Sequence, residues 1–349
     1  MPTSSFLEIP RARLDAIRKI ASALTGVSSV AVTTHINADG DAAGSVAAMA
    51  RLLPQLGLKA VVVNPTPWPT LFAFLKEGLD DRTGSGAEAL RSAGALVSLD
   101  VSDVRRLGSL ANAARSLPGP RIVIDHHVPT DEPAGDIVLA DTMACATGEL
   151  LYDFATVLDL AIDPPIAEAL YTAILTDTGG FRYSNTSPRA HAVAAQLISY
   201  GVDPEYTYRR IYASLSPGRL QLLRDALDSL GVDARFGLAW VSVSNEAMDR
   251  YGVGSDDLDG IVEHPRSVAG TRVALFFRDL GYGKVKVSFR STGDVDVNAL
   301  ARQFGGGGHE KASGALVTGN LDEVRDRVVK AARDFMGPAL AEGNGIPSD

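Results

Sequence analysis

Short apolar runs of strand length alternate with helix-like stretches through the first half of the chain, and this alternation limits the folds open to it. The runs with strand character lie at residues 30–33, 59–63, 95–99 and 121–124. Residues 11–24 and 42–53 instead carry apolar side chains at helical spacing. Strands that are apolar along their whole length need cover on both faces, and intervening helices supply it. The pattern therefore predicts an α/β domain with a mostly parallel sheet flanked by helices.

The second half of the chain has a different pattern. Helical periodicity dominates from residue 146 to about residue 230. Residues 271–278 and 284–290 then alternate between apolar and polar side chains on either side of a turn-like segment, which is typical of a β-hairpin. Residues 321–335 are typical of an amphipathic helix. We therefore predict an α/β domain, a helical connector, a smaller α+β domain and a disordered tail, at residues 1–200, 201–230, 231–336 and 337–349.

The composition excludes several classes of protein. Apolar residues make up 46% and charged residues 21% of the 349 residues, which is ordinary for a globular protein. No apolar run approaches the roughly 18–20 residues that a membrane span needs, and the N-terminus lacks the pattern of a secretory signal. The single cysteine, Cys145, allows no internal disulfide, so we expect a cytoplasmic location. The net charge of −9 argues against an extended, sequence-independent interface with duplex DNA. It does not argue against small phosphorylated substrates bound through metal ions.

Carboxylates and imidazoles follow the predicted strands at the point where each strand ends. Functional groups of α/β sheets collect just beyond these carboxyl ends. The candidates are His35, Asp39 and Asp41 after the first strand, Asp100 after the third, Asp125, His126 and His127 after the fourth, and Asp177 before a Gly-Gly turn. Two divalent cations roughly 3.5–4 Å apart need about this many ligands. The mixture of nitrogen and oxygen donors suits Mn²⁺, Zn²⁺ or Co²⁺ better than a site made only of oxygens would.

Each of these clusters, taken alone, has a simpler structural explanation. Asp39-Gly40-Asp41 is also typical of a turn and a helix N-cap, and a single aspartate after a strand is commonly a loop residue. The adjacent histidines are more informative, because the chain has only six histidines and two of them follow one buried strand. The joint occurrence of all four clusters favours a two-metal hydrolytic site.

Four motifs together resemble the DHH phosphoesterases that carry a DHH-associated C-terminal domain. They are His35-Ile-Asn-Ala-Asp39-Gly-Asp41-Ala-Ala-Gly-Ser45, Asp125-His126-His127, Thr176-Asp177-Thr178-Gly179 and Gly305-Gly-Gly-Gly308-His309-Glu-Lys-Ala-Ser-Gly314. In order and spacing they are most similar to the nanoRNase/pAp-phosphatase (NrnA-like) branch of the family. The resemblance implies a compact two-domain protein with an active-site cleft between the domains.

The resemblance also implies a role for each residue of the metal-binding motifs. One cation would be held by His35, Asp39 and Asp100. The other would be held by Asp41, Asp100, His126 and Asp177, so that Asp100 bridges the two. Asp125 and His127 are the catalytic candidates, since Asp125 would orient an imidazole and His127 would face the substrate phosphate. The family favours Mn²⁺ as the metal, with Mg²⁺ or Co²⁺ as alternatives.

A basic strand gives a separate indication of nucleotide binding. Lys284, Lys286, Ser288 and Arg290 fall on one face of the second hairpin strand. Such a face is commonly a solvated surface, and four consecutive glycines are commonly a flexible loop. The resemblance nevertheless implies that the glycine-rich segment contacts the terminal phosphate of the substrate, and that Arg290 contacts a phosphate or a base. The substrate-binding candidates are Arg290, Ser291, Gly306, Gly307, Gly308 and His309.

The activity that the resemblance implies is hydrolysis of short oligoribonucleotides to mononucleotides, and of 3′-phosphoadenosine 5′-phosphate (pAp) to AMP. Cleavage of cyclic di-AMP or of linear pApA is the nearest alternative, because the same site could perform it. A RecJ-like exonuclease is disfavoured by the acidic charge, and a nucleotide-sensing module by the absence of any substituted ligand position. The expected partners are short single-stranded RNA and small nucleotides, without duplex DNA or membrane, and a homodimer stays open.

Overall fold

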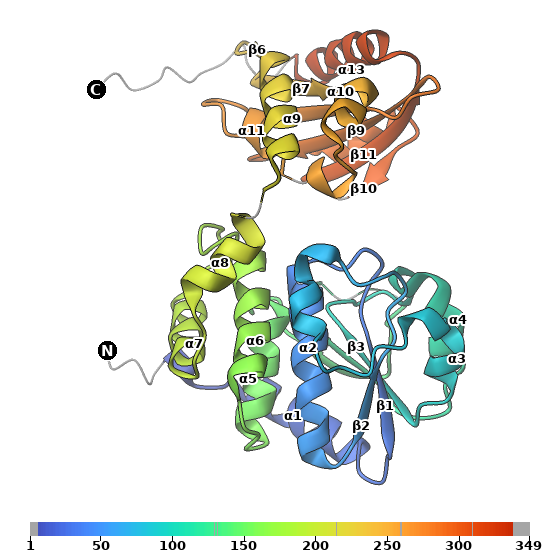
Figure 1. Cartoon of the computed structure of the whole chain (residues 1–349), viewed down its shortest axis with the longest axis vertical. Coiled ribbons are helices and arrows are strands. Elements are labelled where there is room, and N and C mark those ends of the chain that lie inside the picture. The colour runs from blue at the N-terminus through green and yellow to red at the C-terminus, as the bar shows by residue number, and fades with distance from the viewer. Residues whose placement is uncertain are drawn as a thin grey trace. The chain divides into compact units, whose positions relative to one another are not determined.

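The computed structural model describes residues 6–128, 130, 132–213, 215–258, 260–308 and 310–337. The chain forms two compact units, which divide between Ser214 and Leu215, and both are drawn in Figure 1. The boundaries expected at residues 200 and 230 stay predictions. The expected disordered tail lies outside the described residues, except for Gly337 at its start.

Unit 1 is built on a five-stranded sheet in the order β2-β1-β3-β4-β5. Its strands are β1 (Ser29–Thr33), β2 (Lys59–Val62), β3 (Ala95–Leu99), β4 (Arg121–Asp125) and β5 (Ile137–Ala140). Every neighbouring pair is parallel, which confirms the predicted α/β class. The sequence analysis did not predict β5, an edge strand in which only Leu139 is buried.

Helices cover both faces of this parallel sheet, as the buried apolar strands require (Figure 1). The larger core lies under α1 (Arg11–Ala23), α2 (Gly40–Leu52), α5 (Thr147–Val157), α6 (Pro164–Asp177) and α7 (Pro188–Ser199). The opposite face is covered by α3 (Gly86–Arg91), α4 (Ala111–Ser116) and the 3₁₀ segment η5 (Val104–Leu110). The remaining elements of the unit are η2 (Leu53–Leu56), η3 (Thr70–Lys76), η4 (Thr83–Ser85) and α8 (Pro204–Tyr212).

Two glycines let α2 pack unusually close to α6. A methyl group at Gly44 would lie 2.4 Å from the carbonyl oxygen of Ala169, and one at Gly40 would lie 2.4 Å from the side chain of Thr176. Any larger residue at either position would force the two helices apart. The close approach places the first turn of α2, with its polar side chains, beside the last turn of α6.

Unit 2 contains a six-stranded mixed sheet in the order β10-β11-β9-β8-β7-β6. Its strands are β6 (Gly231–Asp233), β7 (Leu238–Val243), β8 (Val273–Asp279), β9 (Lys284–Ser291), β10 (Gly307–Gly308) and β11 (Ala312–Thr318). β8 and β9 are antiparallel neighbours, so the predicted hairpin is confirmed. β7 instead runs parallel to β8, and the long connection between them, which contains α10 (Asn245–Tyr251) and α11 (Glu263–Arg266), makes this direction possible.

Each face of the second sheet has its own core. One core joins the sheet to α9 (Pro217–Asp228), α10 (Asn245–Tyr251) and η6 (Asp256–Leu258), and α11 (Glu263–Arg266) lies against β7 and β8 beside it. The other joins it to α12 (Val297–Arg302) and α13 (Leu321–Met336), and α13 matches the amphipathic helix predicted at residues 321–335. Within the described part of the chain, no helix combines the length and the apolarity that crossing a membrane requires.

A buried ion network ties α1 to the rest of unit 1. The Arg13 side chain is 4% exposed and donates to Asp141 at 2.7 Å, to Glu149 at 2.8 Å and to Asp153 at 2.7 Å. Arg189 on α7 donates to two of the same carboxylates, Glu149 and Asp153. Removing one member of such a network leaves the others buried and without a full set of partners.

We therefore expect Arg13→Ala to lower the free energy of unfolding of unit 1 by about 3 kcal/mol. Arg11→Ala on the same helix is the control, and it should cost under about 0.5 kcal/mol because Arg11 pairs with Asp15 in solvent. Urea denaturation followed by Trp68 fluorescence, in a Trp240→Phe background, reports on unit 1 alone. Equal effects of the two substitutions would contradict a structural role for the network.

Candidate metal centre

The six predicted metal ligands come together at the carboxyl end of the parallel sheet in unit 1. His35 follows β1, Asp100 follows β3 and His126 follows β4, while Asp41 lies in the first turn of α2 and Asp177 ends α6. Together with His127, their ligand atoms form three overlapping groups, each within 4.8 Å: His35 with Asp39 and Asp100; Asp41 with His126 and Asp177; and Asp100 with His126 and His127. Asp100 and His126 each belong to two groups, so the three groups form one cluster.

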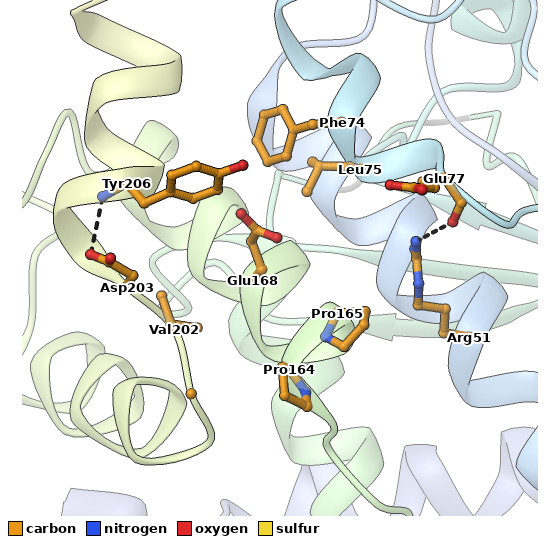
Figure 2. Close-up of a pocket in the computed structure, with 11 residues that line it drawn as sticks. Arg51, Phe74, Leu75, Glu77, Pro164, Pro165, Glu168, Val202, Asp203 and Tyr206 are labelled. Carbon is orange, nitrogen blue, oxygen red and sulfur yellow. Dashed lines mark hydrogen bonds between the residues drawn. The ribbon is translucent and has the colours of Figure 1, made fainter.

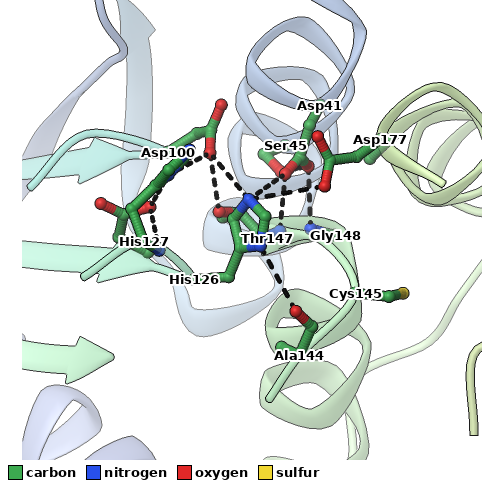
Figure 3. A network of polar contacts seen from close by, with 12 residues as sticks. Asp41, Ser45, Asp100, His126, His127, Ala144, Cys145, Thr147, Gly148 and Asp177 are labelled. Atoms are coloured by element: carbon green, nitrogen blue, oxygen red, sulfur yellow. Dashed lines mark hydrogen bonds and ion pairs between the residues drawn. The ribbon is translucent and has the colours of Figure 1, made fainter. Parts of the chain in front are cut away.

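His126 lies at the centre of this cluster (Figure 3). Its Nε2 atom is 3.7 Å from a carboxylate oxygen of Asp41, 3.6 Å from one of Asp100 and 3.7 Å from one of Asp177. Its Nδ1 atom is 3.3 Å from the carbonyl oxygen of Ala144, to which the protonated Nδ1 donates, leaving the Nε2 lone pair free. Among the described residues, Nε2 is buried and has no hydrogen-bond partner. Three carboxylate oxygens around an unpartnered imidazole nitrogen are a donor set that fits a divalent cation.

His35 is oriented in the same way. Its Nδ1 atom is 2.8 Å from the carbonyl oxygen of Ile36, so Nε2 faces Asp100 at 3.4 Å and Asp39 at 4.0 Å. Asp100 itself has a φ of 56°, a left-handed conformation that is uncommon for residues other than glycine. Strained backbone of this kind concentrates at functional sites, where the surrounding structure holds it in place. The arrangement lets one carboxylate, that of Asp100, face both His35 and His126.

Asp125 is fully buried and holds His127. The carboxylate accepts hydrogen bonds from the Ser102 hydroxyl, from the backbone N–H of His127 at 3.1 Å and from Nδ1 of His127 at 2.8 Å. Hydrogen bonds to Asp100 and Asp125 raise the pKa of His127 to about 10 in the metal-free protein. The imidazole is 46% exposed and carries a positive charge at neutral pH, so it is suited to face an anionic group from solvent.

Several polar groups of the site were missed by the sequence analysis. The backbone N–H groups of Thr147 and Gly148, in the first turn of α5, donate to Asp41 at 2.6 and 3.0 Å, and the Ser45 hydroxyl donates to it at 3.0 Å. The Asn185 amide donates to the carboxylate of Asp177 at 3.2 Å. The hydrogen bonds from α5 to Asp41 join segments more than 100 residues apart, so no local sequence pattern predicts them.

The carboxylates of the cluster repel one another in the absence of cations. Burial, together with the charges of Asp100 and Asp177, raises the pKa of Asp41 well above its usual range. Burial and the neighbouring carboxylates also raise the pKa of Asp177 to about 6, against the opposing effect of His126. For Asp100, burial acts in the same direction, but hydrogen bonds from His127 and His35 outweigh it and lower the pKa. The site therefore collects negative charge that bound divalent cations would neutralise.

The predicted substrate-binding residues all belong to unit 2. Gly307 and Gly308 form the short strand β10, paired with Gly314 and Ser313 of β11, so this part of the expected loop is a strand. A methyl group at Gly306 would lie 2.2 Å from the carbonyl oxygen of Gly314, which explains the need for glycine there. The other expected contact in this segment, His309, lies outside the described residues.

Arg290 and Ser291 end the strand β9 that pairs with β11. The Arg290 guanidinium is half-buried and donates to the carbonyl oxygen of its neighbour Phe289. The Ser291 hydroxyl is buried and donates to the carbonyl oxygen of Val295 at 2.7 Å, so the structure gives it a role in holding the turn before α12.

A pocket of about 410 Å³ lies elsewhere in unit 1 (Figure 2). It is lined by Arg51 from the last turn of α2 and by Pro164 and Pro165 from the first turn of α6. The metal cluster uses the opposite ends of these two helices, through Asp41 and Asp177. The pocket is therefore separate from the cluster.

Replacing Asp177 by asparagine should reveal the charge repulsion directly. A carboxyl group whose pKa is higher in the folded than in the unfolded protein binds more protons when folded, so its contribution to stability falls as pH rises through that interval. For Asp177 the interval runs from 3.8 to about 6. In chelator, Asp177→Asn and the wild type should have similar Tm values near pH 4, and the variant should have the higher Tm at pH 7.

Adding Mn²⁺ at pH 7 should reverse this order, because the wild type keeps the full set of donors. Asp15→Asn, on the exposed side of α1, is the control and should show neither effect. Thermal unfolding with and without Mn²⁺ measures both. A wild-type Tm that does not respond to divalent cations would contradict the metal centre.

Comparison with known protein families identifies two regions. The sequence model of the DHH family N-terminal domain matches residues 29–174, and that of the DHHA1 domain matches residues 240–337. Together the two matched regions cover more than half of the chain. The first contains all of the metal cluster except Asp177, and the second contains every substrate-binding candidate.

Individual proteins are similar over nearly the whole chain. The bifunctional oligoribonuclease and PAP phosphatase NrnA of Thermus thermophilus is 33% identical over 91% of this chain and 94% of that protein. The Bacillus subtilis protein of the same name is 28% identical over 84% of this chain and 90% of that protein. Among solved structures, an exopolyphosphatase-related protein from Bacteroides fragilis superposes with a TM-score of 0.85 and 26% identity, covering 94% of this chain and 98% of that one.

Proposed function

Because the chain belongs to the DHH phosphoesterase family and its DHH domain is followed by a DHHA1 domain, we propose that it hydrolyses short oligoribonucleotides and pAp in a metal-dependent reaction. Its relatives from T. thermophilus and B. subtilis are named for these two activities. The observation that carries the proposal is the convergence of Asp41, Asp100 and Asp177 on the unpartnered Nε2 of His126.

The donor set divides into two cation sites. In the proposal, His35, Asp39 and Asp100 hold one divalent cation, while Asp41, Asp100, His126 and Asp177 hold the other. Two bound cations of this kind activate a water molecule and neutralise charge on phosphoryl oxygens. The mixed nitrogen and oxygen donors favour Mn²⁺, with Mg²⁺ or Co²⁺ as alternatives.

His127 acts on the substrate in this proposal, and Asp125 positions it. Asp125 accepts from the Nδ1 atom of His127, which leaves Nε2–H of the imidazolium to donate to a phosphoryl oxygen. Such a donor is held in place before charge develops, and that is the condition for electrostatic stabilisation of a transition state. Asp125 is fully buried and fixed by Ser102, so the imidazole keeps its direction.

The DHHA1 region holds the rest of the nucleotide in this proposal. Arg290 offers a planar guanidinium, which suits bidentate contact with a phosphate or stacking on a base. Gly306, Gly307, Gly308 and His309 are proposed to contact the terminal phosphate, since a backbone without side chains allows close approach. A cytoplasmic location and a homodimer stay predictions from the sequence.

The test of this function is turnover of a 5′-phosphorylated diribonucleotide with Mn²⁺, with pAp and cyclic di-AMP assayed in parallel. We expect mononucleotide release from the dinucleotide and AMP release from pAp, both abolished by chelator. Asp100→Ala should reduce turnover at least a thousandfold without unfolding the protein, because Asp100 faces both cation sites. Chromatography of the products, with circular dichroism of the variant, provides the measurement.

The outcomes separate the alternatives. Hydrolysis of cyclic di-AMP in preference to the other two substrates would replace the proposed substrate by a cyclic dinucleotide. Retained activity of Asp100→Ala would contradict its bridging position. Metal binding without turnover of any of the three would point to a different phosphorylated substrate.

Arg290→Ala and His309→Ala should mainly weaken nucleotide binding. A hydrogen bond to a charged group contributes roughly 1.5–3 kcal/mol, so we expect KM for pAp to rise about tenfold or more in each variant while kcat changes little. Lys330→Ala, on the exposed side of α13, is the control. Steady-state kinetics with pAp and with bis-p-nitrophenyl phosphate check the assignment. An equal loss on the small diester would place these residues in the chemical step instead.

A further inference from the structure

A small pocket lies on one face of the β8–β9 hairpin in unit 2, next to Arg290. Its volume is about 110 Å³. The strands contribute Phe276, Arg278, Lys286, Ser288 and Arg290. The loop and short helices before β8 close it with Ser255, Leu258, Gly260 and Val262. The pocket therefore extends from Arg290 along β9 toward the hairpin turn, past Ser288 and Lys286.

Three cationic side chains line this pocket. Arg278 on β8 is directly opposite Lys286 on β9 in the antiparallel register. Like charges at directly opposite positions destabilise a sheet. Among the residues that the structure describes, none of the three cations has a carboxylate within 4 Å, and the nearby Glu263 pairs with Arg266 at 3.0 Å. Within the described part of the chain, no direct ion pair thus neutralises Arg278, Lys286 or Arg290.

One donor of the pocket is buried without a partner. The terminal nitrogen of Arg278 donates to the Ser255 hydroxyl at 2.9 Å, whereas its Nε–H has no hydrogen-bond partner among the described residues. Burial lowers the pKa of Arg290, with Glu263 opposing this effect and Arg266 adding to it. A buried guanidinium donor without an acceptor carries a desolvation penalty that an anionic ligand would remove.

The size of the pocket limits what the anion can be. At about 110 Å³ it is smaller than the roughly 150 Å³ cavity that holds a benzene ring, so a nucleobase does not fit inside it. A tetrahedral phosphate group is compact and offers acceptor oxygens in several directions. Two guanidinium groups and an ammonium group match that pattern of acceptors.

We propose that this pocket, formed by Arg278, Lys286 and Arg290, binds an additional phosphate of an oligonucleotide substrate, beyond the one in the glycine-rich segment. The proposal rests on the function proposed above. Such a pocket would distinguish between substrates by the number of phosphates that they carry. A 5′-phosphorylated diribonucleotide and pAp each keep one phosphate that does not react, whereas a 5′-phosphorylated triribonucleotide keeps two. Arg290 contacts all three substrates, and only the trinucleotide keeps a further phosphate for Arg278 and Lys286 while it is being cut.

The pocket therefore makes the enzyme prefer oligonucleotides longer than two residues. Arg278→Gln should raise KM for the trinucleotide about tenfold relative to KM for the dinucleotide and for pAp, which corresponds to about 1.4 kcal/mol. Lys286→Gln should act in the same direction, and because Lys286 is exposed this substitution carries little risk to folding. Lys284→Gln is the matched control, since Lys284 lies on the same exposed side of β9 but does not line the pocket.

A binding measurement separates this proposal from the proposed activity. In chelator, without turnover, the affinity of the full chain for the trinucleotide is measured by calorimetry at several salt concentrations. Each lost phosphate contact should reduce the slope of log affinity against log salt by roughly 0.7, and Arg278→Gln should show this reduction for the trinucleotide alone. A merely structural role for Arg278 would change affinity without changing the salt slope.

The possible results decide the proposal as follows. A selective loss on the trinucleotide in Arg278→Gln and Lys286→Gln, but not in Lys284→Gln, supports the additional phosphate site. Equal losses on all three substrates, or no loss on the trinucleotide, overturn it. If the wild type hydrolyses none of the substrates, the proposed function fails, and the calorimetric comparison of trinucleotide with dinucleotide still decides whether the pocket binds a phosphate.

Discussion

The gathering of three carboxylates, of which those of Asp41 and Asp100 are buried, is the constraint that most shapes the site in unit 1. Asp41, Asp100 and Asp177 converge on one imidazole nitrogen, and the raised pKa values of Asp41 and Asp177 show what this convergence costs in the metal-free protein. A fold tolerates such a cluster only where other interactions hold each group in place. Here the N-terminus of α5 and Ser45 fix Asp41, while the Asn185 amide fixes Asp177. The cluster is therefore an organised set of donors that fits the divalent cations of the proposed function.

Helix packing makes the convergence geometrically possible. Asp41 begins α2 and Asp177 ends α6, and the two helices approach closely because glycine occupies positions 40 and 44. The sheet contributes the other ligands from the carboxyl ends of β1, β3 and β4. These strands are neighbours in the sheet, and because they are parallel their carboxyl ends lie at the same edge. The buried ion network of Arg13 and Arg189 ties α1, α5 and α7 together on the same side of the sheet. The metal centre thus depends on packing between elements more than on any single loop.

In the second unit, too, charged side chains are held in place by the packing of the elements that carry them. The cationic residues of β8 and β9 face a small pocket, and the two cores on either side of the sheet hold these strands rigidly. Ser291, a predicted substrate-binding residue, uses its hydroxyl to hold the turn before α12. Gly307 and Gly308, expected in a loop, form a strand because β11 offers them a pairing partner. In both cases local sequence suggested a contact with substrate, and tertiary pairing revealed a structural role as well.

The sequence by itself determined the class of the fold, and it singled out the residues that the structure brings together in the cluster. Apolar strands with periodic helices between them imply a covered parallel sheet, and polar side chains at the ends of such strands must gather at one edge. The sequence could not determine the edge strand β5, the hydrogen bonds from the backbone of Thr147 and Gly148 to Asp41, or the hydrogen bond from the Asn185 amide to Asp177. These arise where segments far apart in the chain pack together, and no local pattern records such contacts. Only the tertiary structure placed Arg278 opposite Lys286, because strand register is set by long-range pairing, whereas residue type and spacing are local properties of the chain.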